Sequence, residues 1–121
     1  GNEANAEALT LIGDVKDRDV IIVDDEVDTG GSIAQAVNVV KQNGARDIYL
    51  VFVHAILSRN GAERLASLPI KHIITTDSAP LSEDKMHFLE GRITVISVAS
   101  LLGEVIKRAH EGRSVGEMFN E

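Results

Sequence analysis

The sequence predicts an α/β fold: a mostly parallel sheet with flanking helices. Short apolar runs rich in valine and isoleucine recur along the 121 residues, and stretches with helical spacing of apolar residues alternate with them. A hydrophobic content of 44% with 26% charged residues is typical of a globular protein, and the length fits one domain with a real core.

The domain is predicted to cover residues 11–121. Residues 1–10 are polar and alanine-rich, and we interpret them as an arm or a truncated edge. Leu9 to Val15 could form a short edge strand. Val20 to Val23 is a run of four β-branched residues, which predicts a strand buried on both faces, as in a parallel sheet.

A helix is predicted next, with Gly44 as its C-terminal cap. Its apolar residues recur at helical spacing: Ile33, Ala36, Val37 and Val40. Ile48 to Val53 is the next apolar run. Strand, helix and strand together predict a βαβ crossover, which is expected to be right-handed.

A short helix is expected to open at Ser58 to Gly61, with Asn60 and Glu63 spaced as a capping pair and Pro69 ending the pattern. Its core-facing residues are expected to be Ala62, Leu65 and Ala66. Ile73 to Thr76 is predicted to be a third buried strand.

The last third of the domain is predicted to hold a strand at Ile93 to Ile96, a long helix and one more short turn. Pro80 keeps the loop after the third strand from continuing that strand. Gly112 is expected to end the long helix, and Ser114 to Phe119 is expected to form the turn. The apolar stripe of the helix consists of Val98, Leu101, Leu102, Val105, Ile106 and Ala109.

Composition excludes several classes of function. A net charge of −7 argues against nucleic-acid binding, and 3% aromatic residues argues against base stacking. No apolar run is long enough to span a membrane, so no membrane association is expected. The absence of cysteine excludes disulfides and thiolate metal sites and fits a cytoplasmic protein. The three histidines in the second half of the sequence, His72, His87 and His110, show no spacing typical of metal ligands.

The candidate site lies between the first strand and the first helix. Thr29, Gly30, Gly31 and Ser32 precede the helix, so its free backbone amides, two flexible glycines and two hydroxyls form a ready anion site. The plainer alternative is an ordinary strand-to-helix turn with acidic residues at an N-cap. Neither a Gly-x-x-x-x-Gly-Lys-Ser/Thr motif nor a Gly-x-Gly-x-x-Gly motif after a strand is present.

Carboxylates beside this loop restrict the ligand. Asp24, Asp25, Glu26 and Asp28 would repel a bare anion. A sugar phosphate resolves the conflict, because its hydroxyls can donate to Asp24 or Asp25 while its phosphate lies on the loop. A divalent cation held by Asp24 and Asp25 would also relieve the repulsion. We therefore expect a phosphorylated, polyhydroxylated ligand together with Mg²⁺.

At these residues the segment Asp24 to Ser32 resembles the phosphoribosyl loop of the phosphoribosyltransferase superfamily, and most closely that of the ribose-phosphate pyrophosphokinases. The resemblance implies a truncated type I phosphoribosyltransferase-like, Rossmann-like domain. It also implies that Asp24 and Asp25 face the ribose hydroxyls, while Asp28, Thr29, Gly30, Gly31 and Ser32 surround the 5-phosphate. Ser32 replaces the commoner threonine, and Glu26 and Val27 replace two residues that are often apolar.

Three later segments extend the resemblance to the C-terminus. Val53 to Ser58 resembles the family's Ala-Thr-His-x-x-x-Ser segment and would place His54 at the ligand-facing end of its strand; the alternative is a histidine that bonds a nearby carbonyl. Thr75 to Pro80 resembles a family loop, for which a role in loop structure or subunit packing is favoured. Ser114 to Phe119 resembles a segment of the family's allosteric site, although Gly116 departs from it. That match makes Ser114 and Phe119 candidate effector residues; the favoured alternative is a turn whose Met118 and Phe119 pack on the sheet.

The resemblance implies that the full-length protein makes phosphoribosyl pyrophosphate (PRPP) for nucleotide biosynthesis, by transferring pyrophosphate from ATP to ribose 5-phosphate. It assigns no catalytic residue to this chain, because the family's ATP-binding half, basic loop and metal-binding histidine precede this region. The chain is thus interpreted as a C-terminal, ribose 5-phosphate-binding part, inactive alone and part of a homo-oligomer. The alternatives are a phosphoribosyltransferase and an inactive, enzyme-associated regulatory subunit.

Overall fold

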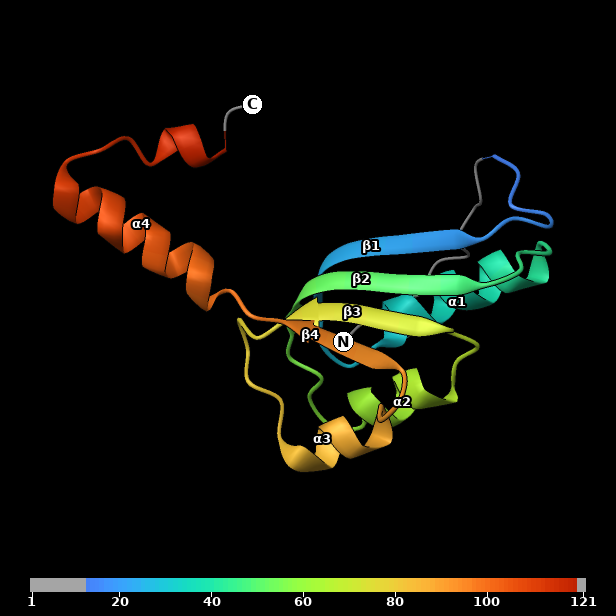
Figure 1. Cartoon of the computed structure of the whole chain (residues 1–121). Coiled ribbons are helices and arrows are strands. Elements are labelled where there is room, and N and C mark those ends of the chain that lie inside the picture. Colours follow the sequence, from blue (N-terminus) through green and yellow to red (C-terminus); the bar gives the residue numbers. More distant parts are fainter. Residues whose placement is uncertain (1–12, 120–121) are drawn as a thin grey trace.

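The structure of the chain, a computed structural model, describes residues 13–119 and contains one parallel sheet (Figure 1). The predicted α/β class is therefore confirmed. Its elements in order are β1 (Val20–Val27), α1 (Gly31–Gln42), β2 (Ile48–Ala55), α2 (Gly61–Ser67), β3 (His72–Thr76), α3 (Glu83–Phe88), β4 (Ile93–Ile96), α4 (Ala99–Glu111) and the 3₁₀ turn η2 (Gly116–Met118). Within these residues no helix combines the length and the apolar character that crossing a bilayer requires.

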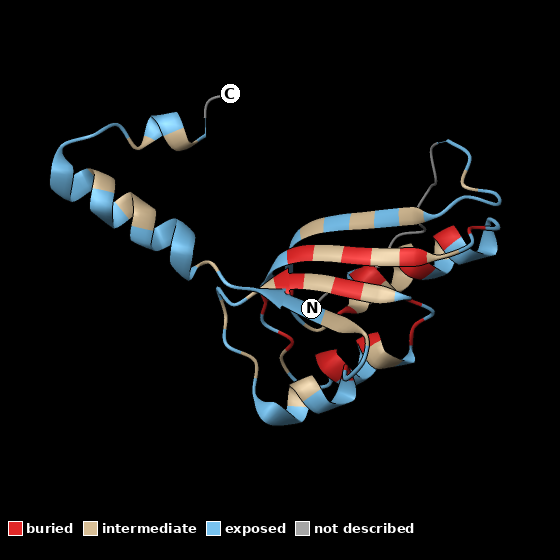
Figure 2. Cartoon of the chain, in the orientation of Figure 1, coloured by how far each residue is buried: buried red, intermediate tan, exposed pale blue. Residues whose placement is uncertain are grey.

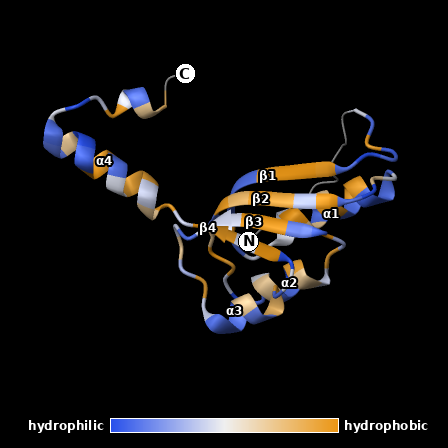
Figure 3. Ribbon diagram, in the orientation of Figure 1, coloured by the Kyte–Doolittle hydropathy of each residue, from blue (hydrophilic) through white to orange (hydrophobic). Residues whose placement is uncertain are grey.

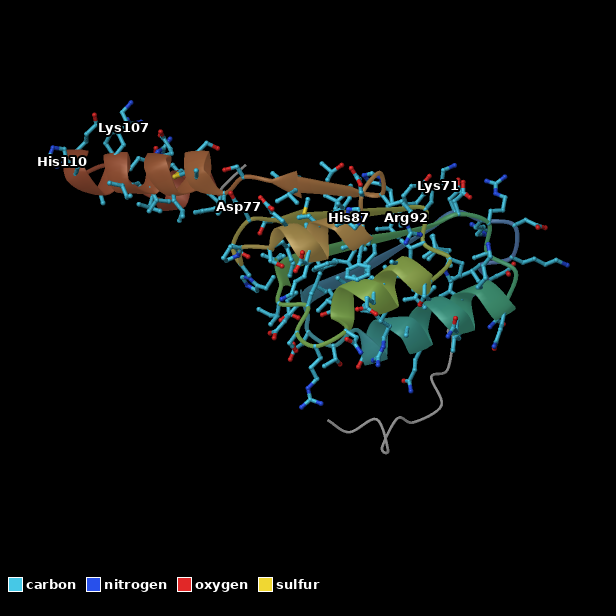
Figure 4. The ribbon with its side chains drawn as sticks, turned by 90° about the horizontal axis from the view of Figure 1, so that it is seen from below. Lys71, Asp77, His87, Arg92, Lys107 and His110 are labelled. Carbon is cyan, nitrogen blue, oxygen red and sulfur yellow. The ribbon has the colours of Figure 1, made fainter. Side chains whose placement is uncertain are left out.

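The strand order in the sheet is β1-β2-β3-β4, and each strand pairs in parallel with the next one along the chain. Crossover connections of one hand then place every connecting helix on the same side of the sheet. Figures 1 and 4 show this arrangement, with α1, α2 and α3 together on one side. We call that side the covered face and the opposite side the open face.

The hydrophobic core lies between the sheet and these three helices. The covered face of the strands contributes Ile48, Leu50, Phe52 and Ile73, which are at most 1% exposed. Val37 of α1, Leu65 of α2 and Leu89 after α3 are fully buried against them. Figure 2 shows the buried residues concentrated in β2, β3 and the helical layer.

The first strand is longer and more exposed than the sequence indicates. β1 runs to Val27, so three of the acidic residues belong to the strand itself. Ile21 and Val23 are 63% and 73% exposed, so the prediction of a strand buried on both faces is wrong. The reason is topological: β1 is an edge strand, and no helix of residues 13–119 packs on the open face. Comparing Figures 2 and 3 shows that β1 is at once apolar and accessible.

Most other elements agree with the predictions. α1 buries Ile33, Val37 and Val40, and Gly44 follows it with φ +91°, as expected of a helix C-terminus. Asn60 does precede α2, but its side chain makes no capping hydrogen bond, so the predicted capping pair is absent.

Two less regular segments differ from what the sequence analysis predicted. The helix α3 was not predicted; Ser82 caps it by accepting from the amide of Lys85, with acidic residues in its first turn. The edge strand proposed for Leu9 to Val15 falls mainly outside the described residues, and its described part, 13–15, is not a strand.

Helix α4 forms where a long helix was predicted, but none of its residues is buried. It leaves the end of β4 and extends away from the sheet and the other helices (Figure 1). Its apolar stripe is accessible, with Leu101, Leu102 and Ile106 between 45% and 68% exposed. Gly112 ends the helix with φ +70°, as predicted.

Candidate functional site

A cavity of about 310 Å³ lies where the sequence places the site, at the carboxyl end of β1 and the beginning of α1. Ligands of parallel sheets commonly bind at such ends. The structure brings all seven predicted residues to its lining. These are Asp24, Asp25, Asp28, Thr29, Gly30, Gly31 and Ser32.

The glycine segment presents the start of α1 to this cavity. Gly30 precedes the helix in the left-handed conformation, with φ +83°, which glycine adopts at little cost. No side chain caps α1, and the first intrahelical bond runs from the amide of Ala34 to the carbonyl of Gly30 at 2.9 Å. The amides before Ala34 therefore have no intrahelical acceptor and can donate to an anion.

The carboxylates on β1 face different sides of the sheet. Asp24 pairs in register with the buried Phe52, which puts Asp24 on the covered face. Asp25, the next residue of the strand, then projects toward the open face. One oxygen of Asp24 accepts from the backbone amides of Asp25 and Glu26, at 2.8 and 3.5 Å.

This arrangement limits how a metal ion can bind. In residues 13–119 no group of three or more histidine or acidic side chains is placed to hold an ion. The second oxygen of Asp24 and the carboxylate of Asp25 accept no hydrogen bond within residues 13–119. Both are chemically suited to bind Mg²⁺. A magnesium ion at this site would thus need further oxygen ligands from the bound molecule.

The chain that follows β2 braces the loop. The carbonyl of Val27 accepts from the amides of Ile56 and Leu57, both at 3.1 Å. The hydroxyl of Ser58 donates to Oδ1 of Asp28. At the start of α2, a Cβ added to Gly61 would lie only 2.6 Å from the carbonyl oxygen of Asp28. Only a glycine at this position permits that approach of α2 to the loop.

The brace itself is a tight segment. Leu57 and Arg59 both have positive φ, 49° and 54°, although neither is glycine. Leu57 is fully buried, which holds the segment against the core.

Sequence reasoning missed that α2 packs against the loop of this site, although the cavity itself is lined by residues 24–33 alone. Arg64 of α2 lies against both glycines of the loop: Cβ atoms added to Gly30 and Gly31 would be 3.5 Å from its Cδ and 3.3 Å from its Nη1. The one available signal for a contact between this region and the loop was the resemblance of Val53 to Ser58 to a family segment, because Ser58 precedes α2 and bonds Asp28. Arg64 is the fourth residue of the short helix α2 and carries no motif of its own, because its proximity to the loop is set by tertiary packing.

Asp77 and Ser78, which follow β3, and His54, near the end of β2, make hydrogen bonds within the protein. Nδ1 of His54 lies 2.8 Å from the hydroxyl of Ser78, not against a carbonyl. That hydroxyl also donates to the carbonyl of Val53 at 3.0 Å. Asp77 accepts from the amide of Val98 at 2.9 Å and so fixes the root of α4. These contacts support the favoured role of this loop in structure.

The candidate effector residues lie far from the cavity, beyond α4 (Figure 1). Phe119 is 63% exposed, so the expectation that it packs on the sheet is wrong. The carbonyl of Ser114 accepts from Nη1 of Arg108 at 3.0 Å. Nε of Arg108 also donates to Glu104 at 2.9 Å, and this bond lowers the pKa of the Glu104 carboxyl.

Comparison with known proteins agrees with the fold. Residues 3–120 match the family described as "Phosphoribosyl synthetase-associated domain". Over 115 residues, 95% of this chain, the sequence is 39% identical to the ribose-phosphate pyrophosphokinase of Haemophilus influenzae. It is 44% identical over 114 residues, 94% of the chain, to the enzyme of the same name from Caldanaerobacter subterraneus subsp. tengcongensis.

A solved structure shows the same architecture. The phosphoribosylpyrophosphate synthetase of Mycobacterium smegmatis superimposes with a TM-score of 0.79 and 39% identity over 84% of this chain. The match covers 33% of that protein, and the two curated relatives are covered to 36% and 35% of their length. The chain therefore spans about a third of the length of the relatives it matches.

Proposed function

The chain belongs to the family of phosphoribosyl synthetase-associated domains, and on that premise we propose that it carries the ribose 5-phosphate site of a ribose-phosphate pyrophosphokinase. The observation that carries the proposal is the cavity lined by Asp24 to Ile33. It combines free amides of a helix N-terminus with carboxylates, the two chemistries that one sugar phosphate needs.

In this proposal the two ends of the cavity bind the two ends of the sugar phosphate. The amides at the start of α1 and the hydroxyls of Thr29 and Ser32 hold the 5-phosphate. Asp24 and Asp25 accept from ribose hydroxyls, directly or through Mg²⁺, whose remaining ligands come from the sugar phosphate and water. Asp28, held by Ser58, shapes the loop between them.

The whole protein is proposed to transfer pyrophosphate from ATP to the 1-hydroxyl of the bound ribose 5-phosphate, giving PRPP. Such transfers depend on positioning and on neutralising charge. This chain contributes the positioning, because the phosphate anchors one end of the sugar and the carboxylates fix its hydroxyls. The same proposal has four further parts. This chain is the C-terminal part of the whole protein, and the ATP site belongs to the rest of it. The whole protein is a cytoplasmic homo-oligomer, and effectors bind near Ser114 and Phe119.

Calorimetric titration of the chain with ribose 5-phosphate, with and without Mg²⁺, tests the proposal. Ser32→Ala removes a phosphate-binding hydroxyl and is expected to weaken binding about tenfold. Ser100→Ala is the matched control, because Ser100 is also the second residue of its helix, α4, and does not line the cavity. Asp24→Asn is expected to reduce the effect of Mg²⁺, whereas Asp84→Asn in α3 is expected to leave it unchanged.

Two results would overturn this assignment. One is a folded wild-type chain that shows no saturable binding of ribose 5-phosphate in the presence of Mg²⁺. The other is equal binding of ribose and ribose 5-phosphate, since a site without a phosphate contribution is not the one proposed.

The related proposal, an inactive regulatory subunit, is favoured by one observation: the matched family is described as synthetase-associated. Assay of the full-length protein separates the two. Formation of PRPP from ATP and ribose 5-phosphate supports the enzyme, and binding without turnover supports the subunit.

A further inference from the structure

We propose that Arg64 of α2 is a phosphate-binding residue of this site and gives it its preference for a doubly charged phosphate. The inference rests on the proposed function and adds to it a residue from outside the loop.

The side chain of Arg64 runs along the glycine pair. Its Cδ lies 3.5 Å from the position of a Cβ on Gly30, and its Nη1 lies 3.3 Å from that of a Cβ on Gly31. Oγ1 of Thr29 lies 3.8 Å from the same point on Gly31. A guanidinium nitrogen and a hydroxyl therefore both lie within 4 Å of the same point at the first residue of α1.

The direction of the side chain follows from helix geometry. Long side chains on a helix lean toward its N-terminus, and the N-terminus of α2 is the end held against the loop by the contact of Gly61 with Asp28. The two loop glycines leave the space that the arginine occupies. The φ of Gly31 is not positive, so its backbone conformation does not require glycine. What matters at Gly31 is the absence of a side chain, which leaves room for Arg64.

Arg64 is an exposed residue that lies beside the positively polarised end of α1. The N-terminus of α1 carries partial positive charge, and a guanidinium beside it is repelled. Among residues 13–119 no carboxylate lies within 4.0 Å of this guanidinium, and its side chain makes no hydrogen bond. An anion between the two positive groups would relieve the repulsion and satisfy both.

The ligand that fits is a phosphate monoester. Its several oxygens can accept at once from amides of α1, from Thr29 and from the planar guanidinium, which suits bidentate contacts. The cation also offsets the carboxylates on β1, which would otherwise disfavour a dianion at this edge. A singly charged anion or a neutral sugar gains less from the same contact.

The test measures the binding of two probes, ribose 5-phosphate and inorganic phosphate, to wild type, Arg64→Met and Arg64→Lys. Arg64→Met is expected to weaken both about tenfold or more, since a charge-assisted hydrogen bond is lost. Arg64→Lys keeps the charge without the planar fork and is expected to fall between. Circular dichroism checks that each variant folds.

Arg59→Met is the local control. It removes the same charge from the preceding loop, and a smaller loss than for Arg64→Met is expected. An equal loss would show that only the net charge of this edge matters and would overturn the assigned contact.

A double variant tests the contact directly. The Cβ in Gly31→Ala would lie 3.3 Å from Nη1, so the flexible end of Arg64 must shift by a few tenths of an ångström. Once Gly31→Ala is present, Arg64→Met is expected to cost less than in wild type. Fully additive effects would contradict the contact.

The outcomes separate this inference from the function it rests on. If ribose 5-phosphate binds and Arg64→Met does not weaken it, the role of Arg64 is overturned and the function stands. If inorganic phosphate binds through Arg64 but the sugar adds nothing, the arginine stands and the sugar-phosphate function falls. Failure of the wild type to bind either probe overturns both.

Discussion

The covered and open faces of the sheet are made of similar residues but have different surroundings. Ile73 and Ile48 on the covered face are fully buried, whereas Ile21 and Val23 on the open face are 63% and 73% exposed. The helix α4 resembles the open face, because its leucines and isoleucine are also accessible. The comparison teaches that apolar composition alone does not determine burial here; the single-sided topology of the helices does.

The largest expected effect is at the core. Ile73→Ala should destabilise the chain by about 2–5 kcal/mol, because it removes buried methyl groups and leaves a cavity. The identical substitution on the open face, Ile21→Ala, should cost about 0.5 kcal/mol or less. Urea unfolding of both variants measures the difference, and equal losses would mean that the open face is covered in solution.

Arginine contacts sharpen the same comparison. Arg92, before β4, donates to the carbonyls of Leu65, Ala66, Leu68 and Ile70 at the end of α2, at 2.8 to 3.4 Å (Figure 4). Arg92→Met should cost about 1.5–3 kcal/mol, because it leaves these carbonyls without their charged donor. Arg113→Met, which loses an exposed pair with Glu111 beyond α4, should cost about 0–1 kcal/mol. A similar midpoint for both in thermal unfolding would refute the distinction.

Two glycines give opposite expected results with the same substitution. Gly61→Ala should destabilise by about 1–3 kcal/mol, because its Cβ would overlap the carbonyl of Asp28 and push α2 from the loop. Gly103→Ala, within α4 and with nothing within 4 Å of its Cβ, should stabilise that helix by about 0.5–1 kcal/mol. Helicity by circular dichroism and the unfolding midpoint test both, and a neutral Gly61→Ala would contradict the close approach.

The smallest effect concerns pH at α4. The bond from Arg108 lowers the pKa of the Glu104 carboxyl below its ordinary value. A carboxyl with a lowered folded-state pKa contributes stability above its unfolded pKa, and the contribution is lost as pH falls through the folded value. Acidification below about pH 4.5 should therefore loosen the end of α4. Nuclear magnetic resonance of Glu104→Gln, in which this acid response should disappear, provides the check.

The sequence predicted most elements and the residues that line the cavity well, for local reasons. The strand β4 and the end of α4 at Gly112 are marked by contiguous residues. The residues that line the cavity are likewise a single run, from the acids of β1 to Ser32. Periodicity and motif spacing are therefore sufficient to find them.

The misses were of tertiary origin. Nothing in the run Val20 to Val23 tells which of its faces has a helix to cover it, so its exposure was not predicted. Arg64 reaches the loop only because Gly61 lets α2 approach Asp28, a contact between segments far apart in the chain. The short helix α3 was the exception, because Ser82 and the acids after it were a local signal that went unused.

The order of the strands also bears on how fast the chain can fold. Every strand pairs with its immediate successor, so each pairing closes one helix-containing loop of modest length. The entropy of loop closure rises with loop length, and no pairing has to wait for the ends of the chain to meet. We therefore expect a low barrier for a parallel sheet, and assembly that can begin at any neighbouring pair and spread in either direction.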